Sequence, residues 1–145
     1  MVWVFLLHAA ATFYMVGLIW FVQLVHYPLF SKVGDTGFVA YQEAHMARTS
    51  FAVGPPMIAE VAGAALLCFA PLQGLPPWSV WLGAGLVGLI WASTAVLQVP
   101  RHEALVAQGF DRAQHAALVA SNWIRTAAWT ARGGLVAWML HTLIS

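Results

Sequence analysis

Four apolar segments, each long enough to cross a lipid bilayer, dominate this sequence and restrict the folds that it can adopt. A helix needs about 20 apolar residues to cross the hydrocarbon core of a membrane. The four segments cover residues 3–25, 51–70, 78–99 and 123–144, to within a few residues. We therefore predict an all-α fold, an integral membrane four-helix up-down bundle that forms a single domain over residues 1–145.

The composition excludes an ordinary soluble domain. Hydrophobic residues make up 61% of the chain and charged residues 8%, whereas soluble domains carry about 25% charged residues. The net charge of +1 gives no reason to expect a nucleic-acid partner. The single cysteine, Cys68, excludes an internal disulfide bond and a cysteine-based metal cluster. We expect the first apolar run to be a retained transmembrane helix, because it lacks the basic leading region of a cleaved signal and is long enough to span the bilayer.

The charged residues between the apolar segments predict the orientation. Residues 31–50 and 100–115 contain most of the charged side chains, whereas residues 71–77 contain none. Because positively charged loops tend to stay in the cytoplasm, we expect both termini to be periplasmic in a bacterial inner membrane. Residues 37–50 and 101–116 have amphipathic patterns, and we expect each to extend a span or to lie along the cytoplasmic surface.

Three charged side chains, Glu60, Arg125 and Arg132, fall inside the predicted spans. A charge near the bilayer centre is costly, so such residues face the interior of a bundle, find partners and often mark a functional site. A rise of about 1.5 Å per residue places Glu60 and Arg132 at similar depths and Arg125 nearer the cytoplasmic surface. We therefore predict a Glu60–Arg132 ion pair, which leaves Arg125 free to bind an anion.

Polar residues gather near the predicted cytoplasmic boundary on all four helices, as a buried site requires. Proton abstraction from an activated carbon needs a base and a group that stabilises the resulting anion. The candidate base is Glu60 or His26, and the candidate stabiliser of an oxyanion or carboxylate is Arg125. The candidate substrate-binding residues are Gln23, Tyr41, Arg48, Gln98, Asn122, Trp129 and Arg132.

Three histidines near the same boundary, His26, His45 and His102, are candidate ligands for a transition metal or a haem iron. No two of them share a helix at the usual ligand spacing, so the cofactor stays open between haem, a transition metal and a cavity that needs neither. A structural interpretation also stays open. In it, the Glu–Arg pair fixes the register of the helices, and the boundary residues only reach water and lipid headgroups.

The stretches TAVLQVPRHEAL and NWIRTAAWTARGGL resemble the C-terminal half of the anthrone-oxygenase-like small four-helix membrane proteins. The matching residues are Val99, Pro100, Leu105, Asn122, Arg125 and Thr126. The first half is more weakly similar to HemJ-type protoporphyrinogen oxidases, four-helix proteins thought to bind haem. The residues that carry this second resemblance are His8, Gly17, Pro28, Met46, Arg48, Pro56 and Met57.

These observations predict an oxidoreductase-like membrane protein whose buried polar site, on the cytoplasmic side, binds or acts on a hydrophobic aromatic or isoprenoid molecule. Two alternatives stay open: a non-catalytic subunit of a respiratory or photosynthetic membrane complex, and a membrane protein that binds haem or a metal. The expected partners are membrane lipid, the hydrophobic small molecule, and other membrane subunits or further copies of the chain.

The predicted orientation is testable by labelling single cysteines. Asp35→Cys and Asp111→Cys should be protected from a membrane-impermeant thiol reagent added outside whole cells, because both positions lie in connections that we place in the cytoplasm. Strong labelling at either position would overturn the orientation.

Overall fold

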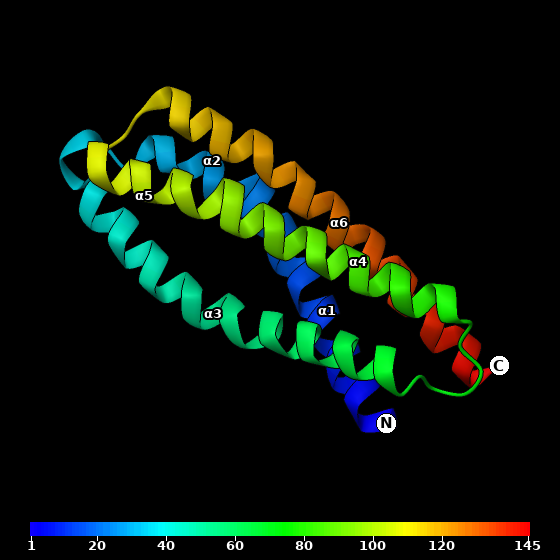
Figure 1. Ribbon diagram of the computed structural model, residues 1–145. Helices are drawn as coiled ribbons and strands as arrows, with labels where there is room; N and C mark the ends of the chain where they lie inside the picture. Colours follow the sequence, from blue (N-terminus) through cyan, green and yellow to red (C-terminus); the bar gives the residue numbers. More distant parts are fainter.

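The computed structural model describes residues 1–145 and is helical throughout except for short connections (Figure 1). The predicted all-α fold is therefore confirmed. The chain forms four long helical segments. The second is the single helix α3 (Asp35–Phe69), and the fourth is the single helix α6 (Arg112–Ile144).

The first and third segments are each interrupted by a wider, π-helical turn. The first contains α1 (Val2–Phe21), a π-turn (Val22–His26), α2 (Tyr27–Leu29) and a 3-10 turn (Phe30–Lys32). The third contains α4 (Pro77–Ser93), a π-turn (Thr94–Gln98) and α5 (Val99–Gln108). Such turns often occur at functional sites.

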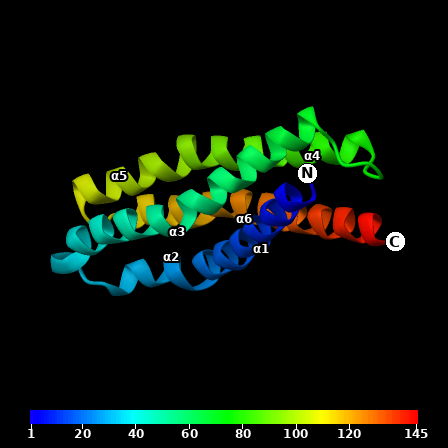
Figure 2. The same ribbon diagram turned by 90° about the horizontal axis from the view of Figure 1, so that it is seen from below.

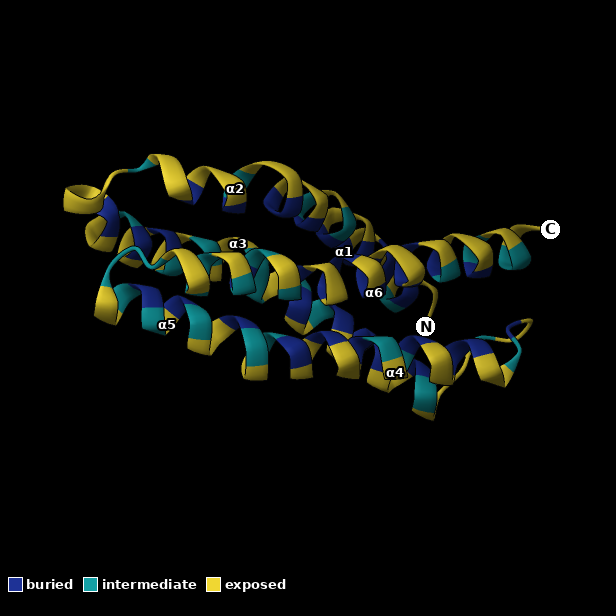
Figure 3. Cartoon of the chain, turned by 90° about the horizontal axis from the view of Figure 1, so that it is seen from above, coloured by how far each residue is buried: buried dark blue, intermediate teal, exposed yellow.

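The two tight connections and the two chain ends lie at opposite ends of the molecule. Residues 33–34 and 109–111 turn at one end, whereas residues 70–76 and both termini lie at the other (Figure 1). Helix α1 packs against α3 and α6, and α4 packs against α6 and α3, an arrangement that can be followed in the perpendicular view of Figure 2. Buried residues face the space between the helices, and exposed residues face outwards (Figure 3).

Three of the four segments are long and apolar enough to cross a membrane, judged by length and composition: Val2–Lys32, Asp35–Phe69 and Pro77–Gln108. They contain the first three predicted spans. Helix α6, with 33 residues, is long enough but is not among them, because Arg125 and Arg132 lower its hydropathy. The fourth predicted span, residues 123–144, stays a prediction.

Prolines interrupt the helices less than the sequence suggests. Proline commonly ends a helix, but Pro28 follows the first π-turn by two residues and the helical path continues to Lys32. Pro100 stands at the same place after the second π-turn. A π-turn absorbs a proline because it already breaks the regular i→i−4 hydrogen bonding that the missing N–H would disturb. Pro55 and Pro56 lie inside the continuous helix α3, which bends partway along its length (Figure 1).

The two amphipathic stretches differ in structure. Residues 37–50 form the first part of α3 and so extend the second segment, as expected. Residues 101–116 do not form one piece, because the chain turns between α5 and α6. Gly109 adopts φ 76°, a left-handed conformation that favours glycine. The Asp111 side chain then caps α6 by accepting a hydrogen bond from the Gln114 backbone N–H at 2.7 Å.

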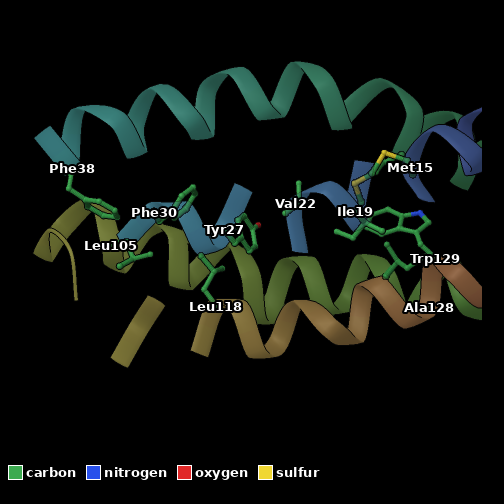
Figure 4. Close-up of a cluster of buried hydrophobic side chains, with 12 residues drawn as sticks. Met15, Ile19, Val22, Tyr27, Phe30, Phe38, Leu105, Leu118, Ala128 and Trp129 are labelled. Atoms are coloured by element: carbon green, nitrogen blue, oxygen red, sulfur yellow. The ribbon is translucent and has the colours of Figure 1, made fainter. Parts of the chain in front are cut away.

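The main hydrophobic core extends along the half of the bundle that contains the tight connections (Figure 4). Phe30, Phe38, Leu105 and Leu118 fill the connection end, and each is completely buried. Trp129, also completely buried, closes the core towards the middle of the molecule. Between these two ends the core includes Tyr27, whose hydroxyl becomes important below.

A close approach between α1 and α3 depends on Gly63. A Cβ at this position would lie 2.6 Å from Nδ1 and 2.8 Å from Cβ of His8. Gly63→Ala should therefore lower the free energy of unfolding in detergent by about 1–3 kcal/mol. Gly134→Ala is the matched control, because nothing lies within 4 Å of its added methyl group. Equal effects of the two substitutions would show that this contact does not limit helix packing.

Candidate functional site

A charged cluster in the middle of the bundle contains the predicted ion pair. Arg132 Nε donates to Glu60 Oε1 at 2.9 Å, and both side chains are almost completely buried. Thr12 Oγ1 donates to the same carboxylate oxygen at 2.8 Å, and Trp129 Nε1 donates to Oε2 at 2.9 Å. Glu60 thus accepts three hydrogen bonds, which compensate for the cost of burying its charge.

All three guanidinium nitrogens of Arg132 make hydrogen bonds. Its Nη1 donates to the Gly83 carbonyl at 2.6 Å, and its Nη2 donates to His8 Nε2 at 2.7 Å. Because arginine only donates, Nε2 of His8 must be the accepting nitrogen, and the imidazole is neutral. The charged cluster formed by His8, Thr12, Glu60, Trp129 and Arg132 is therefore neutral overall. Its residues come from α1, α3 and α6, and the hydrogen bond to the Gly83 carbonyl connects it to α4 as well.

This cluster takes up three of the sequence-predicted site residues. Both carboxylate oxygens of Glu60, the candidate base, accept hydrogen bonds from protein donors. The polar groups of Trp129 and Arg132 donate to Glu60, Gly83 and His8. The structure therefore places these three side chains together but away from the cavity described below, and their predicted catalytic and binding roles stay predictions.

Two further predicted substrate-binding residues, Gln23 and Asn122, hydrogen-bond to each other. Asn122 Nδ2 donates to Gln23 Oε1 at 2.9 Å, and Gln23 Nε2 donates to the Val119 carbonyl at 3.2 Å. Thr126 Oγ1 also lies 3.4 Å from Gln23 Oε1. Neither amide lines the main cavity. Their hydrogen bonds connect the first π-turn to α6, and their predicted role in ligand binding stays a prediction without support from the cavity.

A cavity of about 160 Å³ lies between the charged cluster and the connection end. Much of its wall is apolar and includes Met15, Ile19, Val22, Val53 and Met57. Its polar side chains come from every helical segment and include Tyr27, His45, Thr49, Thr94, Gln98, His102 and Arg125. Four of the sequence-predicted site residues therefore line the same cavity: Gln98, Arg125 and two of the candidate metal ligands, His45 and His102.

Arg125 is the cation that the sequence left without a partner. It is 7% exposed, and the only ion pair in the structure joins Glu60 and Arg132. Its Nε has no hydrogen-bond partner. The guanidinium lies 5.2 Å from the centre of the Trp129 ring, a favourable cation–π contact that supplies no compensating anion.

The structure brings His26, His45 and His102 together at the connection side of the cavity. His26 Nε2 and His45 Nδ1 lie 2.8 Å apart, and the rings of His45 and His102 are centred 5.2 Å apart. His102 is held on both sides, by Gln42 Nε2 at 2.6 Å from Nδ1 and by the Tyr27 hydroxyl at 2.8 Å from Nε2. His26 is half-buried and lies behind His45, not on the cavity wall.

The two histidines on the cavity wall are engaged by neighbouring side chains. His102 Nδ1 accepts from the amide nitrogen of Gln42, so this imidazole is neutral. His45 shares a hydrogen bond with His26, which requires one of the two rings to accept. Arg125 is the only Asp, Glu, Lys or Arg side chain on the cavity wall.

The candidate metal ligands make hydrogen bonds within the protein in place of an open coordination site. No group of three or more His, Cys, Asp or Glu side chains is arranged to hold a metal ion. His26 and His45 bond to each other, and both nitrogens of His102 are engaged by protein groups. The cavity is also smaller than the roughly 300–1,000 Å³ of sites for larger ligands. The geometry thus gives no support to ligation by His26, His45 and His102.

Two more sequence candidates lie away from the cavity. Arg48 is exposed, because its position on α3 faces away from the other helices. Tyr41 is half-buried and packs edge-on against Phe30, with ring centres 5.6 Å apart. The structure does not bring Arg48 or Tyr41 to the cavity, because residues at the same depth along the bundle can face in different directions around their helices.

Sequence reasoning missed Tyr27 and Gln42 as site residues. Gln42 is completely buried beside His102. Tyr27 follows the first π-turn and precedes Pro28, and the corresponding residue after the second π-turn is Val99. The recurrence of a polar residue, one residue and then proline, in HYP and QVP, is a signal that could have drawn attention to Tyr27.

Comparison with known proteins gives no relative on which to base a function, because no family model, curated protein or solved structure matches the chain.

The ion pair predicts a strong energetic coupling. Glu60→Gln and Arg132→Met should each lower the free energy of unfolding by about 3–5 kcal/mol, because each leaves a buried charge without its partner. The double variant should recover much of that loss in a double-mutant cycle measured by denaturation in detergent. Glu60→Gln combined with Arg101→Met, a residue that does not contact the cluster, should be additive. Additivity in the first cycle would exclude the pairing.

Proposed function

We propose that this chain is an integral membrane protein, a four-helix up-down bundle in a bacterial inner membrane with both termini in the periplasm. The length and apolar character of three helical segments support this proposal. For the fourth segment, the ion pair with Glu60 removes much of the free-energy cost of placing the Arg132 charge in lipid. The connections 33–34 and 109–111, together with the charged residues of the flanking stretches 31–50 and 100–115, would then lie on the cytoplasmic side.

We infer that the cavity binds a hydrophobic molecule through an anionic group on that molecule. The observation that carries this inference is Arg125, a buried guanidinium without an acidic partner on an otherwise uncharged and largely apolar wall. Burying an unpaired charge is costly, and an anion that enters the cavity recovers part of that cost. A charge-assisted hydrogen bond to Arg125 would fix the orientation of the bound molecule.

The size of the cavity restricts the part of the ligand that it takes up. Its volume of about 160 Å³ is close to that of an engineered cavity of about 150 Å³ that binds benzene. A single ring therefore fits. Ser50 on α3 and Val99 on α5 line the cavity and are also exposed, so it opens between these two helices. The part of the ligand that does not fit in the cavity, such as an isoprenoid chain, would extend through this opening towards lipid.

We propose oxidoreductase-like chemistry on the bound ring, and the support for this step is the resemblance to the anthrone-oxygenase-like family. Of the residues that carry the resemblance, Arg125 lies on the cavity wall, whereas Asn122 and Thr126 hold Gln23. The cavity itself supplies groups that bind and orient an anion.

Binding of 4-nitrophenolate to the purified protein tests the function. We expect Arg125→Met to weaken its binding by roughly 10- to 100-fold, as for the loss of a hydrogen bond to a charged group. Equilibrium dialysis in detergent would measure the change. Arg101→Met is the matched control, since Arg101 bonds to the Leu97 carbonyl and does not line the cavity. No binding to the wild-type protein, or equal losses in the two variants, would contradict the proposal.

A further inference from the structure

Two uncharged side chains on the cavity wall, Tyr27 and Gln98, can make hydrogen bonds to a ligand that is bound to Arg125. Tyr27 is 4% exposed and Gln98 is 1% exposed, and both line the cavity with Arg125. Each side chain also makes a hydrogen bond to another residue, His102 for Tyr27 and Ser121 for Gln98. These hydrogen bonds determine whether the side chain can donate to a ligand or accept from it.

The hydrogen bonds around His102 make Tyr27 a donor to the cavity. In the orientation of the structure, the Gln42 amide nitrogen faces His102 Nδ1. An amide nitrogen donates and does not accept, so Nδ1 is the accepting nitrogen and the ring hydrogen lies on Nε2. This hydrogen is donated to the Tyr27 oxygen at 2.8 Å, which leaves the phenolic hydrogen of Tyr27 for another acceptor.

Tyr27 keeps this hydrogen near neutral pH. An ordinary tyrosine has a pKa of about 10, so its phenol is neutral at this pH. The neutral phenol and the guanidinium are thus two neighbouring donors on the same wall of the cavity.

Gln98 contributes the opposite type of group, an acceptor. Its Nε2 donates to Ser121 Oγ at 2.9 Å. Ser121 Oγ uses its own hydrogen for the Leu118 carbonyl at 3.2 Å, so it can only accept from Gln98. The amide orientation is therefore fixed. Gln98 Oε1 is buried and has no partner within the protein, so it remains as an acceptor for a ligand.

We propose, building on the anion site above, that the cavity selects a ring that carries one oxyanion and one further hydroxyl group. Arg125 and Tyr27 donate to the oxyanion, and Gln98 accepts the hydrogen of the hydroxyl group. A mono-ionised dihydroxy ring presents both features. An aromatic carboxylate presents acceptors alone and would leave Gln98 Oε1 without a donor.

Two chromophoric probes test the selectivity: 4-nitrocatechol as its monoanion, and 4-nitrophenolate, which lacks the second hydroxyl group. We expect the wild-type protein to bind 4-nitrocatechol about 10-fold more tightly, the value of one hydrogen bond. Gln98→Leu should remove this preference and leave 4-nitrophenolate affinity within about 3-fold. Gln108→Leu is the control, because Gln108 is exposed on α5. Preference that persists in Gln98→Leu would overturn the role of Gln98.

The absorption spectrum of bound 4-nitrophenol tests Tyr27 independently, because its neutral and ionised forms absorb at different wavelengths. Tyr27→Phe should raise the apparent pKa of the bound probe, since the oxyanion loses a donor. Tyr14→Phe, at an exposed tyrosine, should leave it unchanged. An unchanged pKa in Tyr27→Phe would refute the donor role.

The outcomes separate the two proposals. If both probes bind through Arg125 but the wild-type protein shows no preference between them, the selectivity is wrong and the anion site stands. If neither probe binds the wild-type protein, or if their binding does not require Arg125, the anion site is wrong and the selectivity falls with it.

Discussion

The rest of the structure depends on the compensation of the buried charges of Glu60 and Arg132. In an interior with little water, each charge would be very costly alone, and their 2.9 Å contact is reinforced by donors and acceptors from every helical segment. Thr12 and His8 come from α1, the Gly83 carbonyl from α4, and Trp129 from α6. One neutral cluster thus sets the rotation and depth of four helices that otherwise meet through apolar side chains with little directional preference.

The same helix carries a second arginine whose surroundings are the opposite. Arg125 has no carboxylate, and its nearest aromatic partner is Trp129, which already donates its N–H to Glu60. Trp129 therefore separates a compensated charge from an uncompensated one. In our proposal, the charged cluster fixes the helices that form the cavity wall, and an anionic ligand in the cavity would compensate the charge of Arg125. This division explains why a chain with so few charged residues places two arginines in one helix.

The sequence predicted the features that depend on position along a helix. Depth alone paired Glu60 with Arg132 and left Arg125 over, and the common level of His26, His45 and His102 matches their proximity in the structure. It failed where rotation about the helix axis decides. Arg48 lies at the expected level but faces outwards, and Gln23 and Asn122 bond to each other across the gap between helices. Tyr27 was missed because a π-turn changes the direction of the residues after it, and only the recurrence of HYP and QVP in the sequence marks where the two π-turns end.

The central claim is that Arg125 is retained for a ligand and not for the fold, and the stability of the ligand-free protein tests it most directly. The measurement is the free energy of unfolding of Arg125→Met and of the wild-type protein, in the same detergent and without added ligand. Our account predicts that Arg125→Met is more stable by on the order of 1 kcal/mol, because the substitution removes an uncompensated buried charge from a site that favours function over stability. A loss of several kcal/mol would contradict the account, because it would show that Arg125 stabilises the bundle as Arg132 does.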